Sequence, residues 1–290
     1  MILKTPLGRF GISRDAPQGS GMLSGFSFKT NLKAEVWRNG RPVRAKDVIS
    51  AKDRYFGGIN GYHSLIDLGS GLVTNVGVLS MAADFVYANP SATIATTLAA
   101  ANYHFSGKGA TAAAATDISI QTISTNGGQT PVAGAQSLIS AANVQKYQTV
   151  ATIAYTGTEA VTEWGLITNG TVSTSTGTPF TAGSATSGTV TGTPLTASST
   201  TVLGQQLNIM TDTSNATPMW GLVTSNTTSV AQVPAWYKIA DGTAAGATPA
   251  NADTLLWRPI MWDHKVFSAI NVLNGDSVQY TYLLTITSGG

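Results

Sequence analysis

The stretch DHKVFSAINVLNGDSVQYTYLLTITSGG, residues 263–290, decides the fold class of this chain. Apolar and polar residues alternate on both sides of Asn274 and Gly275, and a period of two is that of a strand with one buried face. Asn and Gly tolerate the positive φ of a tight turn, so the stretch predicts two antiparallel strands joined as a hairpin. A chain that keeps its last residues in a strong strand closes a β-fold with them. We therefore expect residues 263–287 to lie in the core of a β-rich protein.

The composition supports a β-rich protein without cysteine chemistry. Only 10% of the 290 residues are charged, against about 25% in a typical soluble domain, and Thr, Ser, Ala and Gly make up the bulk. Long helices draw on Glu, Lys, Arg and Leu, so a helix-rich fold is not expected. The absence of Cys excludes disulfides and thiolate nucleophiles. No apolar run approaches the roughly 20 residues of a membrane span, and the N-terminus interleaves charge, Gly and Pro, unlike a secretory signal.

Other patterns predict where the remaining elements lie. Residues 31–37 alternate before an Asn39-Gly40 turn, and the Thr-rich residues 147–167 contain further strands. Residues 72–85 fit one short helix with Thr74 or Asn75 as its cap.

These patterns predict a mainly β protein with a β-sandwich or jelly-roll-like core and one or two short helices. We expect the core to comprise residues 31–167 and 256–290 and to be preceded by an extended, basic and Gly-rich arm over 1–30. Residues 168–255 are rich in Thr, Ser and Gly and predict an inserted β-rich subdomain. In its first part, over 168–202, short hairpins are favoured over disorder because Thr and Val prefer strands.

The net charge of +2 hides a strong asymmetry along the chain. Residues 1–56 hold 11 of the 16 basic residues but only 4 of the 14 acidic ones. Such a segment is either an ordinary solvated arm or a surface that binds an acidic partner. No helix-turn-helix, ribonucleoprotein or zinc pattern accompanies it, so an acidic protein surface is favoured over nucleic acid. The candidate partner-binding residues are Lys4, Arg9, Arg14, Lys29, Arg41, Arg44 and Lys46.

No catalytic or metal-binding constellation is recognisable. His63, His104 and His264 have neither another His nor a carboxylate cluster at ligand spacing, and His104 is expected to be a packed or hydrogen-bonded residue. Glu159 and Glu163 lie among Thr and Val, which favour strand and turn over a helix that would align them. The sequence has no G-x-S-x-G elbow and no phosphate-binding loop. We therefore expect a protein that is not an enzyme and that uses no cofactor or metal.

The tryptophans allow two interpretations. A sugar-binding face, as in a carbohydrate-binding adhesin, could be lined by Trp37, Trp164, Trp220, Trp236, Trp257 and Trp262. They could equally anchor a β-core or contacts between subunits, because Trp contributes a large buried area at low entropic cost. We favour the second interpretation and add Trp220 and Trp236 to the candidate partner-binding residues.

Five blocks resemble a known family. They are NLKAEVWRNG (31–40), GLVTNVGV (71–78), NYHFSGKGATAAAATD (102–117), YQTVATIAYTGTEAVTEWGL (147–166) and the stretch 263–290. Together they cover about half of the chain and are similar to virion structural proteins encoded by tailed bacteriophages and prophages. The Thr-Glu-x-Gly-Leu motif and the C-terminal block are the most specific parts. Familiar members pass quickly from one to the other, whereas residues 167–262 intervene here.

The resemblance implies a non-enzymatic virion protein that is made in the bacterial cytoplasm and then assembled with other virion proteins and with copies of itself. We expect a capsid decoration, or cement, protein whose basic arm lies on the acidic head lattice and whose Thr-rich insertion faces solvent. A tail component, such as a tube, collar or fibre-attachment protein, is the alternative within this class. The adhesin is the alternative outside it.

Overall fold

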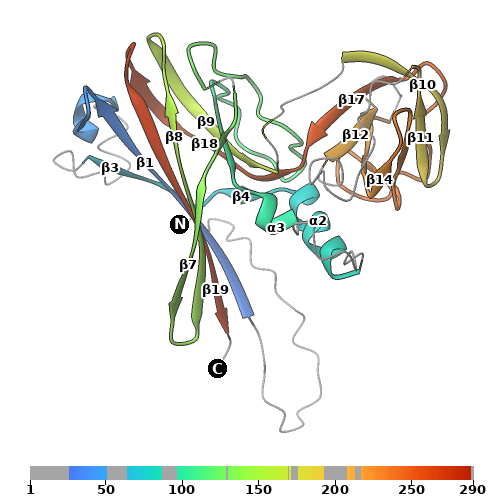
Figure 1. The fold of residues 1–290 in the computed structure, drawn as a ribbon, viewed down its shortest axis with the longest axis horizontal. Helices are drawn as coiled ribbons and strands as arrows, with labels where there is room; N and C mark the ends of the chain where they lie inside the picture. The colour runs from blue at the N-terminus through green and yellow to red at the C-terminus, as the bar shows by residue number, and fades with distance from the viewer. Residues whose placement is uncertain are drawn as a thin grey trace, which may run out of the picture.

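The computed structural model describes residues 26–50, 64–86, 97–128, 130–168, 170, 176–192, 208–212 and 217–288. The fold is mainly β, as predicted, with two facing antiparallel sheets and a third sheet at one end (Figure 1). Residues 1–25 of the predicted arm lie outside the described residues, and residues 26–30 belong to the first strand.

The C-terminal strand lies in the middle of the first sheet. The strand order is β2 (Arg41–Pro42), β1 (Phe26–Arg38), β19 (Ser277–Ser288), β8 (Val144–Ala154) and β7 (Ala135–Ala141), and β3 (Leu65–Gly69) also pairs with β1. On β19 the alternate residues Val278, Tyr280, Tyr282 and Leu284 are buried. The alternation read from the sequence therefore identifies the face that points into the core.

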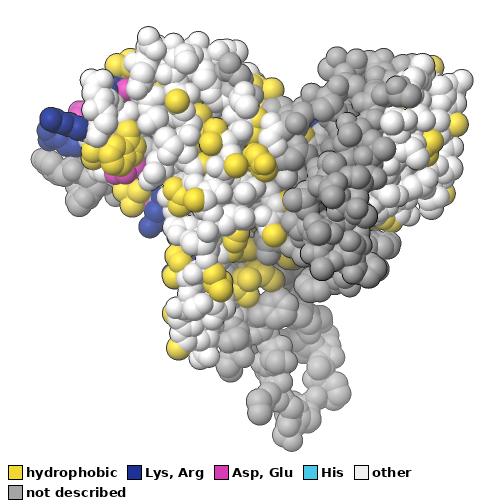
Figure 2. Space-filling model, viewed as in Figure 1, with side chains coloured by type: hydrophobic (Ala, Val, Ile, Leu, Met, Phe, Trp, Pro, Cys, Tyr) yellow, Lys and Arg dark blue, Asp and Glu magenta, His cyan; other side chains and the backbone are white. Residues whose placement is uncertain are grey.

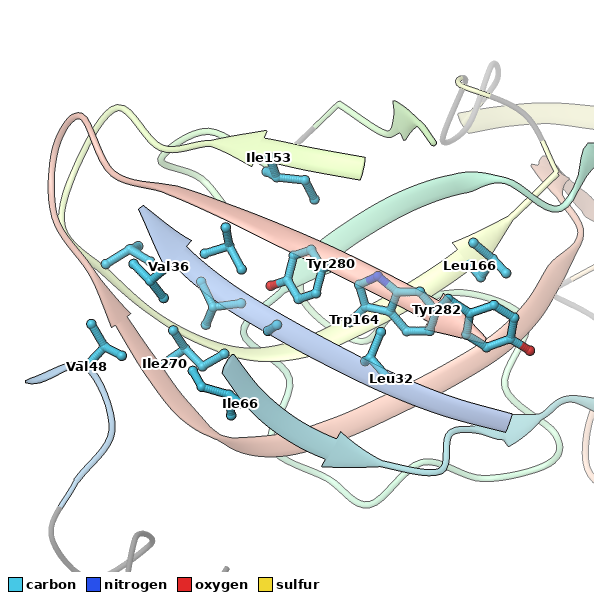
Figure 3. Close-up of a cluster of buried hydrophobic side chains, with 14 of the residues drawn as sticks. Leu32, Val36, Val48, Ile66, Ile153, Trp164, Leu166, Ile270, Tyr280 and Tyr282 are labelled. Carbon is cyan, nitrogen blue, oxygen red and sulfur yellow. The ribbon is translucent and has the colours of Figure 1, made fainter. Parts of the chain in front are cut away.

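The second sheet packs on that face. It runs β4 (Leu72–Val73), β18 (Met261–Val272), β9 (Glu159–Ile167), β5 (Tyr103–Gly107) and β6 (Val132–Ala133). Between the sheets the indole ring of Trp164 stacks on Tyr282 with their centroids 5.6 Å apart and with Leu32 beside them, while Ile270 and Ile66 lie at the other end of the same cluster (Figure 3). The indole N–H of Trp262 donates to the Tyr282 hydroxyl at 3.2 Å. The predicted β-sandwich core is thus confirmed.

The predicted C-terminal hairpin is wrong in its pairing. The turn at Asn274 and Gly275 forms, with Gly275 at a φ of 84°, but β18 pairs with β9 and β4 whereas β19 pairs with β1 and β8. The turn is an arch that carries the chain from one sheet to the other. Alternation shows that each strand has a buried face, and two such faces can be buried against each other as well as side by side in one sheet.

A second arch lies against the first one. The connection from β8 to β9 also crosses between the sheets, and Tyr155 at its start forms two backbone hydrogen bonds with the first arch. The Tyr155 N–H donates to the Asp276 carbonyl at 2.8 Å, and the Tyr155 carbonyl accepts from Gly275 N–H at 3.0 Å. The Arg38 guanidinium binds both carboxylate oxygens of Asp276 at 2.7 Å and so ties β1 to the same arch.

The helical elements are short. They are the 3-10 helix η1 (Ala45–Asp47), α2 (Asn75–Val86) and α3 (Thr97–Ala100). The predicted cap is confirmed, because the Thr74 hydroxyl oxygen accepts the Gly77 N–H at 3.1 Å.

A third, eight-stranded sheet occupies the part of the chain for which an inserted subdomain was predicted. Its order is β14 (Ser225–Asn226), β15 (Val230–Gln232), β11 (Ser187–Val190), β10 (Thr176–Ser184), β17 (Thr254–Pro259), β12 (Asn208–Asp212), β13 (Met219–Leu222) and β16 (Trp236–Lys238). In the sequence, all eight strands fall between β9 and β18. The antiparallel β10 and β11 form a hairpin of the kind favoured for this Thr-rich tract. Trp220 and Leu222 pack against Phe105 and Ile120 and so join this sheet to the sandwich.

Candidate functional site

Glu163 in β9 holds the long loop that follows β5. Its side chain is fully buried and accepts backbone N–H groups from Gly109 at 2.9 Å, Gln121 at 2.5 Å and Thr122 at 3.2 Å. This loop has little regular structure of its own, so its amides need acceptors from elsewhere. One carboxylate on a rigid strand supplies them.

His264 in β18 joins this carboxylate to a second one. Its Nε2 lies 2.9 Å from Glu163 Oε1, and its Nδ1 lies 2.6 Å from Asp117 Oδ2. The imidazole is fully buried, as is the Glu163 side chain, whereas Asp117 is partly exposed. The three residues are far apart in the sequence and meet only because β18 pairs with β9.

The electrostatics of this trio favour a charged imidazole between two carboxylates. Burial would lower the pKa of His264, but the hydrogen bonds and charges of Glu163 and Asp117 outweigh burial and raise it. Burial would raise the pKa of Glu163, but the bonds from His264 and from three backbone amides lower it. Both ring nitrogens therefore donate to carboxylates, and neither is left as a general base. The trio can hold a loop in place but cannot activate a nucleophile.

Glu159, also in β9, holds the next residues of the same loop in the way that Glu163 holds Gln121 and Thr122. Its carboxylate accepts the hydroxyl of Ser124 and the N–H of Thr125, and it lies 3.1 Å from the ammonium of Lys108. Burial would raise the pKa of Glu159, and these three partners lower it. The strand prediction for Glu159 and Glu163 is confirmed, and both carboxylates serve the same loop.

Three residues of the Thr-Glu-x-Gly-Leu motif, Thr162–Leu166, contact this loop, which explains why these residue types are present. The Thr162 hydroxyl donates to the Gly109 carbonyl at 2.7 Å. A Cβ at Gly165 would come within 3.0 Å of Ile120 in the loop and of Met261 on the neighbouring strand. The motif is therefore accounted for by packing and hydrogen bonding.

His104 is a neutral, fully hydrogen-bonded core residue, as predicted. Its Nδ1 accepts the indole N–H of Trp164 at 3.2 Å, so Nε2 carries the proton and faces the Thr149 hydroxyl at 3.2 Å. Burial lowers the pKa of His104 to about 3.

Asp263 is a buried acid that forms no salt bridge within the described residues. It is fully buried, and neither of its carboxylate oxygens has a hydrogen bond of normal geometry. Burial raises the pKa of Asp263 to about 7, although the nearby Tyr282 hydroxyl, His264 and Lys265 act in the opposite direction. A Cβ at Gly71 would lie 1.9 Å from Asp263 Oδ1, so only Gly leaves room for this carboxyl group.

A groove of about 670 Å³ is lined by β18 from His264 to Ser268 and by Ser70, Gly71 and Leu72. Lys265 on its wall donates to the Ser70 carbonyl at 2.7 Å, and small residues such as Ala110 and Ala112 form the other side. Within the described part of the chain, no three His, Asp or Glu side chains are arranged to hold a metal ion. In those same ranges, no helix has the length and apolar character to cross a bilayer.

The basic candidate residues do not form one surface. Lys29 is exposed near the start of β1, whereas Arg41 and Arg44 are exposed beyond its other end and Lys46 is half-buried. Nine residues of β1, 30–38, lie between Lys29 and the group at 41–46. Lys4, Arg9 and Arg14 lie outside the described residues.

The proposal of Trp220 and Trp236 as partner-binding residues needs correction. Trp220 is 2% exposed and stacks on Tyr237 at a centroid distance of 4.9 Å, and Trp236 is 3% exposed with its indole N–H donated to the Ser184 carbonyl at 2.9 Å. Trp164 is fully buried as well. These rings anchor the cores of the sheets within one chain. They therefore form neither a sugar-binding face nor a contact surface.

The first sheet extends beyond the sandwich. Figure 1 shows the lower ends of β1, β19, β8 and β7 continuing past the second sheet. All seven residues of β7, at the edge, are exposed, including Leu138 at 72% and Ile139 at 41%. On the face seen in Figure 2 this part carries hydrophobic and uncharged side chains and no coloured charges. No alternation marks β7 in the sequence, and residues 135–141 contain no charge and no Pro.

Comparison with known protein families, with curated proteins and with solved structures found no match. Any function assigned to this chain must therefore be argued from its own residues and geometry.

Proposed function

We propose that this chain is a non-enzymatic structural protein of a tailed-bacteriophage particle and that it decorates the capsid. One observation carries the proposal: the buried side chains of Glu159, Glu163 and His264 have structural partners, and the exposed β7 edge is uncharged. The buried carboxylates and histidines hold loops and strands to one another, while the first sheet leaves an uncharged edge open for assembly. A subunit of a larger assembly is expected to combine such a buried polar network with an exposed sheet edge.

The blocks that resemble phage virion proteins support the same proposal by where they lie. The block 31–40 forms most of β1, and 102–117 forms β5 with the loop that Glu163 holds. The block 147–166 spans β8, its arch and β9, and the block 263–290 spans β18, its arch and β19. The blocks that carry the resemblance thus fall on the sandwich, its two arches and its buried polar network.

Capsid decoration is favoured within this class by the basic N-terminal part. Residues 1–56 have an excess of seven positive charges, of which residues 1–25 contribute two, with three basic residues and one acidic residue. The chain enters β1 at Phe26, on the part of the first sheet that extends beyond the sandwich. A basic segment that leaves the fold at such a point can contact an acidic lattice without disturbing the core.

A tail component is the second candidate because of the open β7 edge. Subunits of a tail tube share a continuous sheet, and an exposed edge strand can continue a sheet into a neighbouring subunit. The adhesin lacks a comparable observation, since Trp164, Trp220, Trp236 and Trp262 are buried and Trp37 is only partly exposed.

The proposal is tested with phage particles that are assembled without this protein, from a phage whose copy of the gene has been deleted. Purified full-length protein is added back, and its position is read by immunogold electron microscopy. We expect label on heads. A variant with Lys4, Arg9 and Arg14 changed to Gln should lose that label, whereas the matched control with Arg41, Arg44 and Lys46 changed to Gln should keep it. Label confined to tails would replace decoration by the second candidate, and label on neither part would overturn both.

A further inference from the structure

We propose that two copies of this chain pair through β7, edge to edge and antiparallel, so that their first sheets become one continuous sheet across a two-fold axis. The inference concerns the protein itself and does not depend on its place in a particle. It begins from the exposure of β7 (Ala135–Ala141). Every one of its seven residues is exposed, on both faces of the strand.

The edge is regular and unprotected. β7 pairs with β8 over its whole length, from Ala135 opposite Val150 to Ala141 opposite Val144, without a bulge. Soluble proteins usually protect such an edge with Lys, Pro, a bulge or a covering segment, because its outward N–H and C=O groups attract another strand. β7 has no Lys, Pro or bulge, no strand among the described residues pairs with its outer edge, and its sequence AQSLISA contains no charged residue.

The sequence of β7 suits a copy of itself. An antiparallel pair centred on Leu138 places each Ala135 opposite Ala141 of the partner copy and each Gln136 opposite Ser140. In this register only Leu138 meets its own copy, and because it is uncharged no like charges meet at the two-fold axis. Two-fold contacts of this self-complementary kind are the commonest in soluble oligomers.

When two β7 strands pair in this way, the exposed Leu138 of each copy is covered. Leu138 lies opposite Tyr147 of β8, whose hydroxyl donates to the Ala101 carbonyl at 3.0 Å and whose ring packs against the core. Pairing at the axis places the two Leu138 side chains side by side between the two Tyr147 rings. Cross-strand apolar neighbours of this kind stabilise a sheet, and the pairing covers the large side chain that is most exposed in the described part of the chain.

Sedimentation equilibrium of the full-length protein tests the pairing. We expect a dimer whose dissociation constant rises by about tenfold or more in Leu138→Lys, because the two ammonium groups would meet at the axis. The matched control is Leu65→Lys, which changes an exposed Leu (47%) at the opposite edge of the same sheet. The control should leave the dimer intact. A wild-type monomer at all concentrations, or equal weakening by both variants, would overturn the inference.

A cross-linking experiment provides an independent readout. Because the chain has no Cys, Leu138→Cys introduces a unique thiol. Cα atoms directly opposite each other in an antiparallel pair lie about 4.5–5.5 Å apart, within the range of a disulfide. Under a mild added oxidant, this variant should form a covalent dimer, and Leu65→Cys should not. A ring of three or six copies, or cross-linking at position 65 alone, would contradict the two-fold pairing.

Discussion

Replacing Asp263 with Asn should abolish a pH-dependent loss of stability that originates in the core. The pKa of Asp263 is about 7 in the folded protein because burial disfavours its charged form, and an unperturbed Asp has a value of 3.8. The folded state therefore binds the proton more tightly than the unfolded state. For an acid with a raised pKa, stability is fully present below pH 3.8 and is lost progressively as the pH rises to about 7.

The size of this loss follows from the two pKa values. A difference of about three pH units corresponds to about 4 kcal/mol in the free energy of unfolding. Of this, roughly 2–3 kcal/mol should be lost between about pH 5 and pH 8, and nothing further above that range. Asn has nearly the shape of the protonated acid and cannot ionise, so Asp263→Asn should not lose this free energy as the pH rises.

The assay is urea unfolding followed by tryptophan fluorescence at several pH values from 5 to 9. The difference between variant and wild type reports the ionisation of Asp263 together with its coupling to His264 and Lys265, because groups that do not interact with Asp263 contribute equally to both proteins. We expect the difference to grow in favour of the variant as the pH rises and then to level off. Asp47→Asn, at an exposed carboxylate, serves as the control and should show no such growth. Parallel curves for the Asp263 variant and wild type would refute the reasoning.

Three further predictions concern contacts on which the sandwich depends. Gly71→Ala should destabilise the protein by about 1–3 kcal/mol because a Cβ would overlap a buried carboxyl group, and thermal unfolding measures this. Arg38→Ala should cost about 2 kcal/mol at neutral pH because it leaves the buried Asp276 without its guanidinium. The pKa of Asp276 is lowered chiefly by its bond to Arg38, so this deficit should shrink as acid protonates the carboxylate, as unfolding at pH 3 would show. Glu163→Gln removes two acceptor sites from backbone amides and the counter-charge of His264, and it should increase hydrogen exchange of the 109–122 amides more than exchange in β1 or β19.

Five long strands of the sandwich could be predicted from the sequence. Alternation located β1, β18 and β19, the Thr-rich composition of 147–167 indicated β8 and β9, and Thr74 marked the start of α2 through its capping hydroxyl. Pairing could not be predicted in the same way. The Asn274-Gly275 turn is compatible with a hairpin and with an arch, and only the positions of the other strands decide between them.

The buried polar network was not predictable, for a different reason. Asp117, Glu163 and His264 are separated by 46 and 101 positions, and no spacing rule connects residues that meet across a sheet and a loop. The sequence likewise does not determine whether a tryptophan side chain is buried or exposed. Tryptophan serves equally well as a core anchor or as a contact residue, and only the packing shows that Trp220 and Trp236 are buried.

By itself, the sequence determined that this chain is mainly β, that its last strand belongs to the core, and which side chains of that strand face inward. These properties are local, since they follow from a period of two and from side-chain chemistry along one segment. The tertiary structure alone decided that the C-terminal turn is an arch, that two glutamates of β9 hold the loop after β5, and that β7 is left as an open edge. Each of these depends on which strands become neighbours, and that choice is made by the burial of all the apolar faces at once.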